Sequence, residues 1–258
     1  ETYEQNIMGT VNALELFRNC PSSEVFVGIT SDKCYENREW VWGYRENDRL
    51  GGYDPYSSSK AGAEIVISAY RDSFFNPLHS SCHNKSVSSV RAGNVIGGGD
   101  WAKDRIVPDC IRALKDNKPI NIRNPYATRP WQHVIEPLFG YLLLGAKMSE
   151  DKIKYSGAWN FGPDSDSIIP VKDIAEKIVG LWGNGQWKNA SDQKKALLHE
   201  ANVLSLDCSK SKRQLNWKPL FNIDQALELT VDWYKNYTKT DVYDICKEQI
   251  NRYCGLIT

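Results

Sequence analysis

Apolar side chains follow two different periods along this chain. Near the N-terminus they recur every three or four residues, as an amphipathic helix requires, at Ile7, Val11, Leu14 and Phe17. A short continuous apolar run follows from Val25 to Ile29 and ends in the polar sequence TSDK. Such a run is typical of a buried parallel strand whose carboxyl end opens onto a site.

The two patterns alternate over most of the chain. They predict further helices over residues 56–75, 105–117, 135–148, 171–182 and 223–237. They predict further strands and turns over residues 85–100, 118–124 and 157–163, and a loop over residues 38–55. Strands alternating with helices indicate an α/β fold with a parallel sheet. The elements become shorter after about Gly97. We therefore expect one domain over 1–96 and a smaller α/β lobe over 97–258, some of whose segments return to the first domain.

Composition and charge argue against several classes of function. Lys and Arg total 32, as do Asp and Glu, so no net field attracts nucleic acid or an anionic membrane surface. No apolar run reaches the length of a membrane span, and the first residues do not resemble a signal peptide. The seven cysteines include no Cys-x-x-Cys pair, which suits reduced thiols in the cytoplasm. His79, Cys82 and His83 lack a second ligand pair, so we expect no metal site.

Two polar clusters are candidates for chemistry. Neither the dinucleotide-binding pattern G-x-G-x-x-G nor the phosphate-binding pattern G-x-x-x-x-G-K-[ST] is present. What remains is Ser31-Asp32-Lys33 at the end of the first strand, and Tyr56 with Lys60 on the next helix. Residues four apart on a helix share a face, so Tyr56 and Lys60 can approach the same ligand.

A tyrosine becomes a useful base when a lysine lies nearby. Its pKa of about 10 makes it a poor base at neutral pH, and an adjacent ammonium favours the phenolate. A hydride-transfer enzyme needs such a group to remove an alcohol proton. The spacing alone is weak evidence, because Tyr243 and Lys247 repeat it near the C-terminus. Without a catalytic role, Tyr56 and Lys60 would be an exposed pair on a helix, and Ser31-Asp32-Lys33 would be a polar strand end that caps a turn. The presence of both clusters favours a catalytic role for Tyr56 and Lys60.

Several longer motifs, taken together, resemble a known family. They are NIMGTVNALE (6–15), TSDKCY (30–35), PYSSSK (55–60), VRAGNVIGGGDWAKDRIVPD (90–109), RPWQHVIEP (129–137) and WNFGP (159–163). In this order they are similar to extended short-chain dehydrogenase/reductases, and most closely to the branch that dehydrates CDP-glucose. The resemblance implies a Rossmann-like sheet, NAD as cofactor, CDP-glucose as substrate, and a homodimer formed through the helix carrying Tyr56 and the helix before it. It also implies deoxysugar synthesis for O-antigen or lipopolysaccharide.

The resemblance assigns roles to the two clusters. Tyr56 would remove the proton of the sugar 4-hydroxyl, Lys60 would support Tyr56 and hold the cofactor, and Ser31 would hydrogen-bond the 4-oxygen. Asp32 would protonate the leaving 6-hydroxyl. Related dehydratases acting on other nucleotides have a glutamate as the base at C5 where this chain has Lys33. Lys33 could serve only when deprotonated, which would require a pKa lowered by burial or by Lys60.

Substrate contacts are implied further along the chain. Asn94 and Arg129 match residues that hold the substrate diphosphate, and a planar guanidinium suits that task. Arg105 and Asn160 are weaker candidates by the same resemblance. The part from 97 to 258 would be mainly the sugar-nucleotide-binding lobe.

The resemblance begins partway into the family's first domain. On the order of a hundred residues, including the glycine-rich turn that cradles the pyrophosphate, would precede Glu1 in a complete member. We therefore expect this chain to be a fragment of a dehydratase. The alternatives are another NAD-dependent sugar-nucleotide enzyme, such as an epimerase or a decarboxylase, and a non-catalytic sugar-nucleotide-binding module. An epimerase would need neither the acid at Asp32 nor a base at Lys33.

Overall fold

The computed structural model describes residues 1–191 and 204–257, which belong to two compact units. Unit 1 comprises residues 1–93, 137–162 and 204–218. Unit 2 comprises the described parts of 94–136, 163–203 and 219–258. Each unit is therefore assembled from three separate stretches of the chain.

Unit 1 is built around a parallel sheet of three strands in the order β1-β2-β7. Parallel neighbours need crossover connections, and long helices precede β2 and β7. The prediction of an α/β fold with a parallel sheet is confirmed. The elements in chain order are a π-helical turn (Glu4–Met8), α1 (Gly9–Asn19), β1 (Val25–Ile29), a 3₁₀ turn (Asp32–Cys34), α2 (Pro55–Phe74), a second 3₁₀ turn (Pro77–His79), α3 (Ser80–His83), β2 (Ser86–Arg91), most of α5 (Ile135–Glu150), β7 (Gly157–Asn160) and α7 (Ser209–Gln214).

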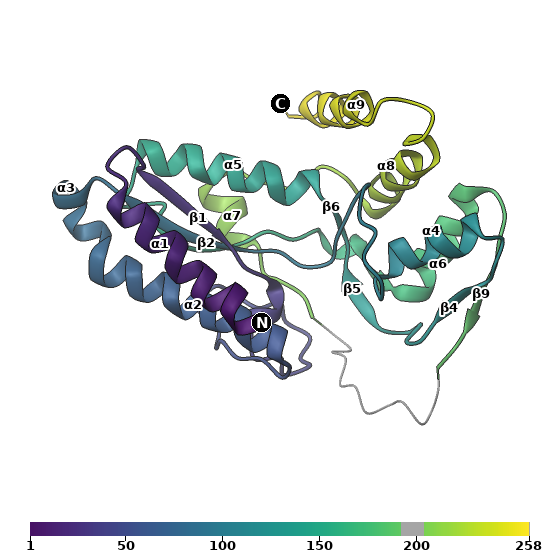
Figure 1. The fold of residues 1–258 in the computed structure, drawn as a ribbon, viewed down its shortest axis with the longest axis horizontal. Coiled ribbons are helices and arrows are strands. Elements are labelled where there is room, and N and C mark those ends of the chain that lie inside the picture. Colours follow the sequence, from purple (N-terminus) through teal and green to yellow (C-terminus); the bar gives the residue numbers. More distant parts are fainter. Residues whose placement is uncertain (192–203, 258) are drawn as a thin grey trace. The chain divides into compact units, whose positions relative to one another are not determined.

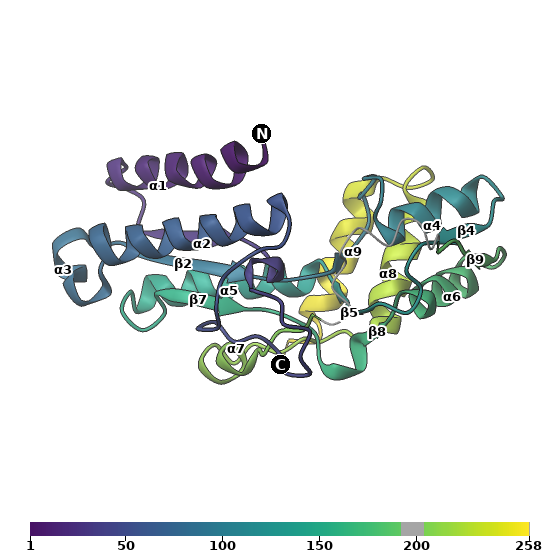
Figure 2. The same cartoon turned by 90° about the horizontal axis from the view of Figure 1, so that it is seen from below.

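The two faces of this sheet carry separate cores. Successive side chains of a strand point to opposite faces. On one face Phe26 and Val87 pack in a cluster with residues of α1 and α2. On the other, Val27 and Val90 pack with residues of α5 and the segment around α7 (Figures 1 and 2). The sheet is thus covered by helices on both sides, as a parallel sheet requires.

Strand β1 is less buried than its sequence predicts. All of β2 is buried, whereas β1 is partly buried and 58% of Ile29 is exposed. Within the described residues β2 has a strand on each side, but β1 pairs only with β2. The prediction of a strand is confirmed and the prediction that it is buried is wrong, because burial depends on neighbours in the sheet that the strand's own sequence does not reveal.

Unit 2 contains shorter pieces of sheet. In its described part, β3 pairs with β6 and β4 with β9 in parallel, while β5 and β8 are antiparallel. Its core lies among α4, α6 and α8 and includes Ile111, Ile178 and Leu227. The elements are β3 (Val95–Ile96), α4 (Ile106–Lys115), β4 (Ile120–Ile122), β5 (Thr128–Pro130), β6 (Gln132–His133), a 3₁₀ turn (Ser165–Ser167), β8 (Ile168–Pro170), α6 (Val171–Trp182), β9 (Trp187–Asn189), α8 (Ile223–Asn236) and α9 (Val242–Cys254).

A buried carboxylate joins α9 to the rest of unit 2. Glu136 accepts hydrogen bonds from the backbone N–H groups of Leu220 (2.8 Å) and Phe221 (2.6 Å). Its other oxygen accepts the hydroxyl of Tyr253 on α9 (2.8 Å). These bonds satisfy a group that would be costly to bury alone.

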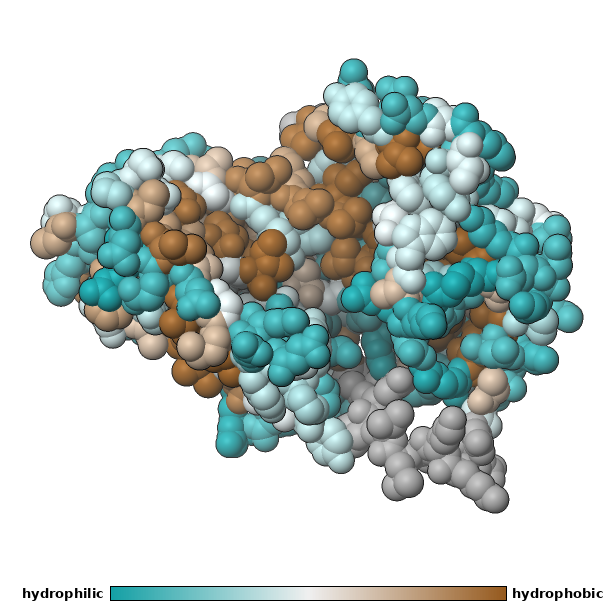
Figure 3. All heavy atoms as spheres, viewed as in Figure 1, coloured by the Kyte–Doolittle hydropathy of each residue, from teal (hydrophilic) through white to brown (hydrophobic). Residues whose placement is uncertain are grey.

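Some helices keep apolar side chains at the surface. Leu16 of α1 is 73% exposed, Ile65 of α2 is 59% exposed and Leu142 of α5 is 76% exposed. Apolar surface over α5 is visible in Figure 3. In the part of the chain that the structure describes, no helix is long and apolar enough to cross a membrane.

Candidate active site

The polar segment after β1 is held in a tight turn. The Oγ of Ser31 accepts the backbone N–H of Lys33 (3.2 Å) and donates to Oδ1 of Asp32 (3.0 Å). The N–H of Asp32 donates to the carbonyl of Ala92, beyond β2 (3.2 Å). Ser31 and Asp32 are buried, whereas Lys33 is exposed. Burial, one of the two ways in which Lys33 was expected to become a base, is therefore not provided by this structure.

Asp32 lies against the backbone that follows β2. A Cβ added to Gly93 would be 1.7 Å from Oδ2 of Asp32, far inside any tolerated contact. Only glycine leaves room for the carboxylate at this position. The glycine of the motif RAGN is thus explained by the space that Asp32 occupies.

Helix α2 begins with a strong N-terminal cap. Asp54 accepts the backbone N–H groups of Tyr56 (2.9 Å) and Ser57 (3.0 Å), and also the hydroxyl of Ser57 (2.6 Å). Pro55 suits the first helical position, where no donor is needed. Tyr56 is 44% exposed and Lys60, on the same face of the helix, is half-buried. The cap fixes where the helix starts and so fixes the position of Tyr56.

Electrostatic contacts link the turn to the start of α2. The Nζ of Lys33 lies 6.0 Å from the centre of the Tyr56 ring. Partial burial alone would raise the pKa of Asp54, but hydrogen bonds from Ser57 and Tyr56 and the charge of Lys33 lower it overall. Burial lowers the pKa of Lys60. The two clusters that the sequence singles out are therefore neighbours within unit 1.

A groove of about 450 Å³ lies beside Lys60. Its size is within the range of small-molecule sites. Its walls come from the π-helical turn at Glu4–Met8, from α1, from β1 and from α2, and combine polar and apolar groups. The lining residues are Gln5, Asn6, Gly9, Thr10, Ala13, Phe26, Val27, Gly28, Ile29, Lys60 and Ile67.

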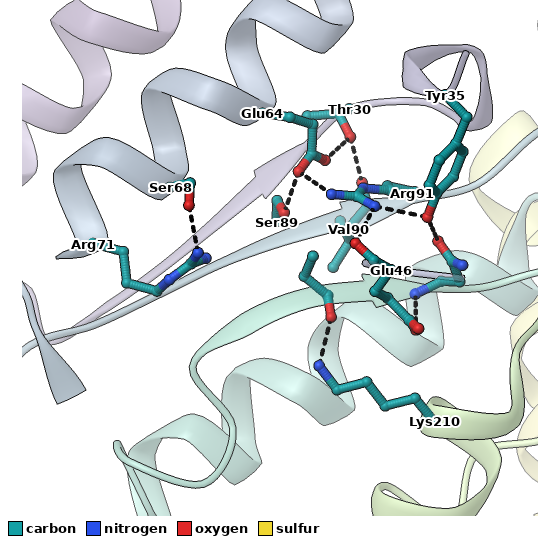
Figure 4. A network of polar contacts seen from close by, with 12 residues as sticks. Thr30, Tyr35, Glu46, Glu64, Ser68, Arg71, Ser89, Val90, Arg91 and Lys210 are labelled. Carbon is teal, nitrogen blue, oxygen red and sulfur yellow. Dashed lines mark hydrogen bonds and ion pairs between the residues drawn. The ribbon is translucent and has the colours of Figure 1, made fainter. Parts of the chain in front are cut away.

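A buried polar network lies behind the two clusters (Figure 4). Glu64, one turn beyond Lys60, accepts hydrogen bonds from Arg91 (2.6 Å), Ser89 (2.7 Å) and Thr30 (2.5 Å). Glu64 and Arg91 are each only 3% exposed. Burial alone would raise the pKa of Glu64, but the hydrogen bond and charge of Arg91 and the two hydroxyls lower it overall. The pair is therefore ionised in the interior.

The network extends to Asn160 at the end of β7. Arg91 donates to the hydroxyl of Tyr35 (2.7 Å), which donates to Oδ1 of Asn160 (2.8 Å). The Nδ2 of Asn160 donates to the carbonyls of Tyr44 (2.8 Å) and Asp207 (3.2 Å). Asn160 is fully buried and its donors are used within unit 1. The structure thus places Asn160 inside the protein's own network, where it holds the loop after β1.

The other three predicted substrate residues lie in unit 2. Asn94 has a left-handed backbone (φ 47°), and its carbonyl accepts the N–H of Gln132 (3.3 Å). Arg105, just before α4, pairs with Asp100 (2.9 Å) and is 66% exposed. Arg129 lies on β5 and is half-buried. All three residues lie in the first stretch of unit 2, residues 94–136.

Glu64 and Arg91 are not among the residues predicted from the sequence, although signals for both are present in it. Glu64 follows Lys60 at the same spacing at which Lys60 follows Tyr56, so all three share one helix face. Arg91 is the only charged residue in the strand SVSSVR. A charge in a buried strand requires a partner, and that requirement could have been used to search for one.

Comparison with known proteins decides the family. The profile of the GDP-mannose 4,6 dehydratase family matches residues 1–230. The chain belongs to this family. It is 48% identical to the CDP-glucose 4,6-dehydratase of Salmonella typhimurium, over the whole chain and 72% of that protein. It is 25% identical to the UDP-glucuronate 4-epimerase of Thermodesulfobacterium geofontis, over 90% of the chain and 65% of that protein.

Solved structures confirm the Rossmann-like fold of this dehydratase family member. The dTDP-glucose 4,6-dehydratase of Bacillus anthracis, crystallised with NAD, matches with a TM-score of 0.74 and 22% identity, over 91% of the chain and 68% of that structure. The UDP-glucuronic acid 4-epimerase of Bacillus cereus, in complex with NAD, matches with a TM-score of 0.72 and 19% identity, over 92% of the chain and 68% of that structure. The chain thus spans about two thirds of each of these structures.

Proposed function

We propose that this protein is an NAD-dependent dehydratase that converts CDP-glucose to CDP-4-dehydro-6-deoxyglucose. The observation that carries the proposal is the meeting, within unit 1, of Ser31-Asp32-Lys33 with the capped start of α2 that bears Tyr56 and Lys60. The relative with 48% identity, which has the name of this activity, supports the choice of CDP-glucose. The reaction removes one water across C5 and C6 and is redox-neutral overall.

The residues around Lys60 fit a nicotinamide cofactor. Lys60 presents a half-buried ammonium beside the groove of about 450 Å³, and no carboxylate of the described residues forms an ion pair with it. An ammonium has three donors and can hold the hydroxyls of a ribose. NAD, when bound, would supply a reversible hydride acceptor for oxidation at C4 and reduction at C6.

The chain's own residues would move the protons. Tyr56 would take the proton of the 4-hydroxyl, with its phenolate favoured by nearby ammonium groups. Ser31 would hydrogen-bond the 4-oxygen, and Asp32 would give a proton to the leaving 6-hydroxyl. Because a ketone at C4 acidifies the proton at C5, a modest base suffices there. Lys33, close to the Tyr56 ring, is our candidate for that base. In this role Lys33 would first have to lose its own proton, which the positive charge of Lys60 would favour.

Unit 2 is our candidate for the part that holds the sugar nucleotide, and unit 1 for the part that holds the cofactor. Arg129 and Arg105 supply guanidinium groups suited to a diphosphate, and Asn94 supplies an amide. We leave Asn160 out of the substrate set because its donors are already used within the protein.

We also infer a cytoplasmic homodimer. All seven cysteines are free thiols, which suits a reducing compartment. Leu16 and Ile65 are exposed apolar residues on α1 and α2, the helices that the resemblance places at the interface. The double variant Leu16→Glu/Ile65→Glu should sediment as a monomer, and Leu142→Glu on α5 should leave the dimer intact. The opposite result would place the interface on α5.

The function is tested on the full protein as its gene encodes it. The protein is incubated with NAD and, separately, with CDP-, UDP-, dTDP- and GDP-glucose, and the absorbance of a 4-keto sugar in alkali is followed. Keto sugar from CDP-glucose supports the proposal. If keto sugar forms only from another nucleotide sugar, the assignment of CDP-glucose as the substrate is wrong. Formation of CDP-galactose alone would indicate an epimerase, and tight binding without any product would indicate a binding module.

A further inference from the structure

We propose that Thr30, Glu64 and Arg91 form a positioning device that holds Ser31-Asp32 in register with Tyr56. The inference rests on the proposed dehydratase function. None of the three groups acts on the substrate. Their role is to fix the distance between the acid on the strand end and the base on α2, through the bonds drawn in Figure 4.

Glu64 carries the position of α2. It lies eight residues after Tyr56 on the same helix face, about 12 Å along the axis at 1.5 Å per residue. The helix between them is continuous from Pro55 to Phe74. A carboxylate fixed at Glu64 therefore fixes the start of the helix as well, together with the cap at Asp54.

Thr30 carries the position of the strand end. Its backbone N–H donates to the carbonyl of Val90 (2.9 Å), so Thr30 is fixed within the plane of the sheet. Its hydroxyl lies 2.5 Å from Oε1 of Glu64 and 3.2 Å from the carbonyl oxygen of Val90, and the shorter bond ties it to the helix above the sheet. Ser31 and Asp32 follow directly in the chain. The Thr30 hydroxyl is thus a direct tie between the strand-end cluster and the helix of Tyr56.

Arg91 keeps the carboxylate of Glu64 ionised and fixes its orientation. One nitrogen bonds Oε2 of Glu64 (2.6 Å), and another bonds the hydroxyl of Tyr35 (2.7 Å) and the carbonyl of Glu46 (3.0 Å). A buried ion pair gains little net stability, because desolvation offsets the attraction, and apolar pairs of similar volume often replace one without loss. An apolar pair at this place would not hold the carboxylate of Glu64 in one direction, as the hydrogen bond from Arg91 does.

The matched test compares two hydroxyls that bond the same carboxylate. Thr30→Val and Ser89→Ala each remove one buried hydroxyl donor to Glu64, but only Thr30 adjoins the catalytic segment. In the full protein with NAD and CDP-glucose, we expect Thr30→Val to lower kcat about 10-fold or more with little change in KM, because small misplacements of reacting groups are costly. Ser89→Ala should stay close to the wild type. Thr30→Ser, which keeps the hydroxyl, should restore most of the activity.

An isotope effect separates positioning from loss of folded protein. With CDP-glucose deuterated at C4, the isotope effect on kcat should change in Thr30→Val. It increases if a misplaced Ser31 slows the step at C4, and it decreases if a misplaced Asp32 slows the loss of water. A smaller folded fraction would lower kcat and leave the isotope effect unchanged. Equal losses in Thr30→Val and Ser89→Ala, wild-type activity in Thr30→Val, or an unchanged isotope effect would each overturn the proposal.

Two further measurements keep the test decisive. If Thr30→Val does not fold, Glu64→Asp keeps the charge opposite Arg91 but shortens the side chain, and it should show the same isotope signature; wild-type kinetics would overturn the idea. If the wild type makes no keto sugar at all, the proposed function fails. Hydrogen exchange at the amide of Asp32 then decides the positioning role, which predicts faster exchange in Thr30→Val than in Ser89→Ala.

Discussion

Two helices of this protein begin in the same way, but only α2 begins beside a strand-end cluster. In α2 the capping aspartate accepts the backbone N–H of Tyr56 at 2.9 Å, and in α9 the capping aspartate accepts that of Tyr243 at 2.9 Å. Each tyrosine is followed four residues later by a lysine, Lys60 or Lys247. The two helix starts therefore share an aspartate cap on the tyrosine N–H and the same spacing of tyrosine and lysine.

The difference lies in what surrounds each pair. The cation near the Tyr56 ring is Lys33, from the turn after β1, at 6.0 Å. The cation near the Tyr243 ring is Lys247 of its own helix, at 5.9 Å. Lys60 is half-buried beside a groove, whereas Lys247 is exposed. A tyrosine and a lysine four residues apart thus become a candidate site only where the helix start meets a strand end.

The largest expected effect comes from removing the two tyrosine hydroxyls in turn. Tyr56→Phe should lower kcat for keto-sugar formation about 1,000-fold, within the range found for loss of a general base. Tyr243→Phe, the matched control on α9, should keep wild-type kcat. Comparable activity in the two variants would show that the surroundings of Tyr56 have no catalytic meaning.

The second-largest expected difference is between substitutions of Lys60 and Lys247. Lys60→Met should lower kcat about 100-fold and weaken NAD binding, because the group that supports the phenolate and holds the ribose is lost. Lys247→Met should change neither quantity. Steady-state kinetics and a fluorescence titration with NADH measure both. Normal NAD binding in Lys60→Met would remove Lys60 from the cofactor site.

The pH dependence of the wild type sharpens the same comparison. Burial disfavours the ammonium of Lys60, so this group loses its proton at a lower pH than an ordinary lysine, whose pKa is about 10.4. Activity that needs the cation is present at lower pH and lost as the pH rises through the lowered pKa. The alkaline limb of kcat/KM should therefore lie below about 10.4, persist in Lys247→Met and be absent from Lys60→Met. A limb that survives in Lys60→Met would belong to another group.

Much of the fold could be predicted from periodicity alone. The helix predicted over residues 171–182 is α6 with the same bounds, and the helix predicted from residue 56 is α2. The strands β5, β6, β8 and β9, two or three residues long, were missed. Such short strands have no period of their own, and only their partners across the sheet define them.

The candidate site was predictable only in part, for a similar reason. Motifs along the chain singled out Lys33 and Tyr56, which the structure brings together in unit 1. The tie between Glu64 and Arg91 joins a helix to a strand that lies 27 residues away, and no local pattern records such a pair. Asn160 was expected to bind substrate, but its bonds to the loop after β1 became visible only with the loop in place.

The smallest expected effect concerns the caps that the two helices share. Asp54→Ala and Asp241→Ala should each lower the free energy of unfolding by about 1 kcal/mol, as loss of a helix cap does. Asp54→Ala should lose more, because Asp54 accepts two backbone N–H groups and a hydroxyl. Only Asp54→Ala should also lower kcat, by a few-fold, since it frees the first turn that carries Tyr56.

Substitution of each capping aspartate by asparagine keeps the helix cap and removes its negative charge. Asn caps a helix as well as Asp does, so Asp54→Asn and Asp241→Asn should restore most of the stability. If Asp54→Asn also restores kcat, the backbone position of Tyr56 is what the cap supplies. If its kcat remains low while stability returns, the charge of Asp54 near Lys33 matters for the reaction. A loss of kcat in Asp241→Ala equal to that in Asp54→Ala would break the comparison, because global stability would then explain both.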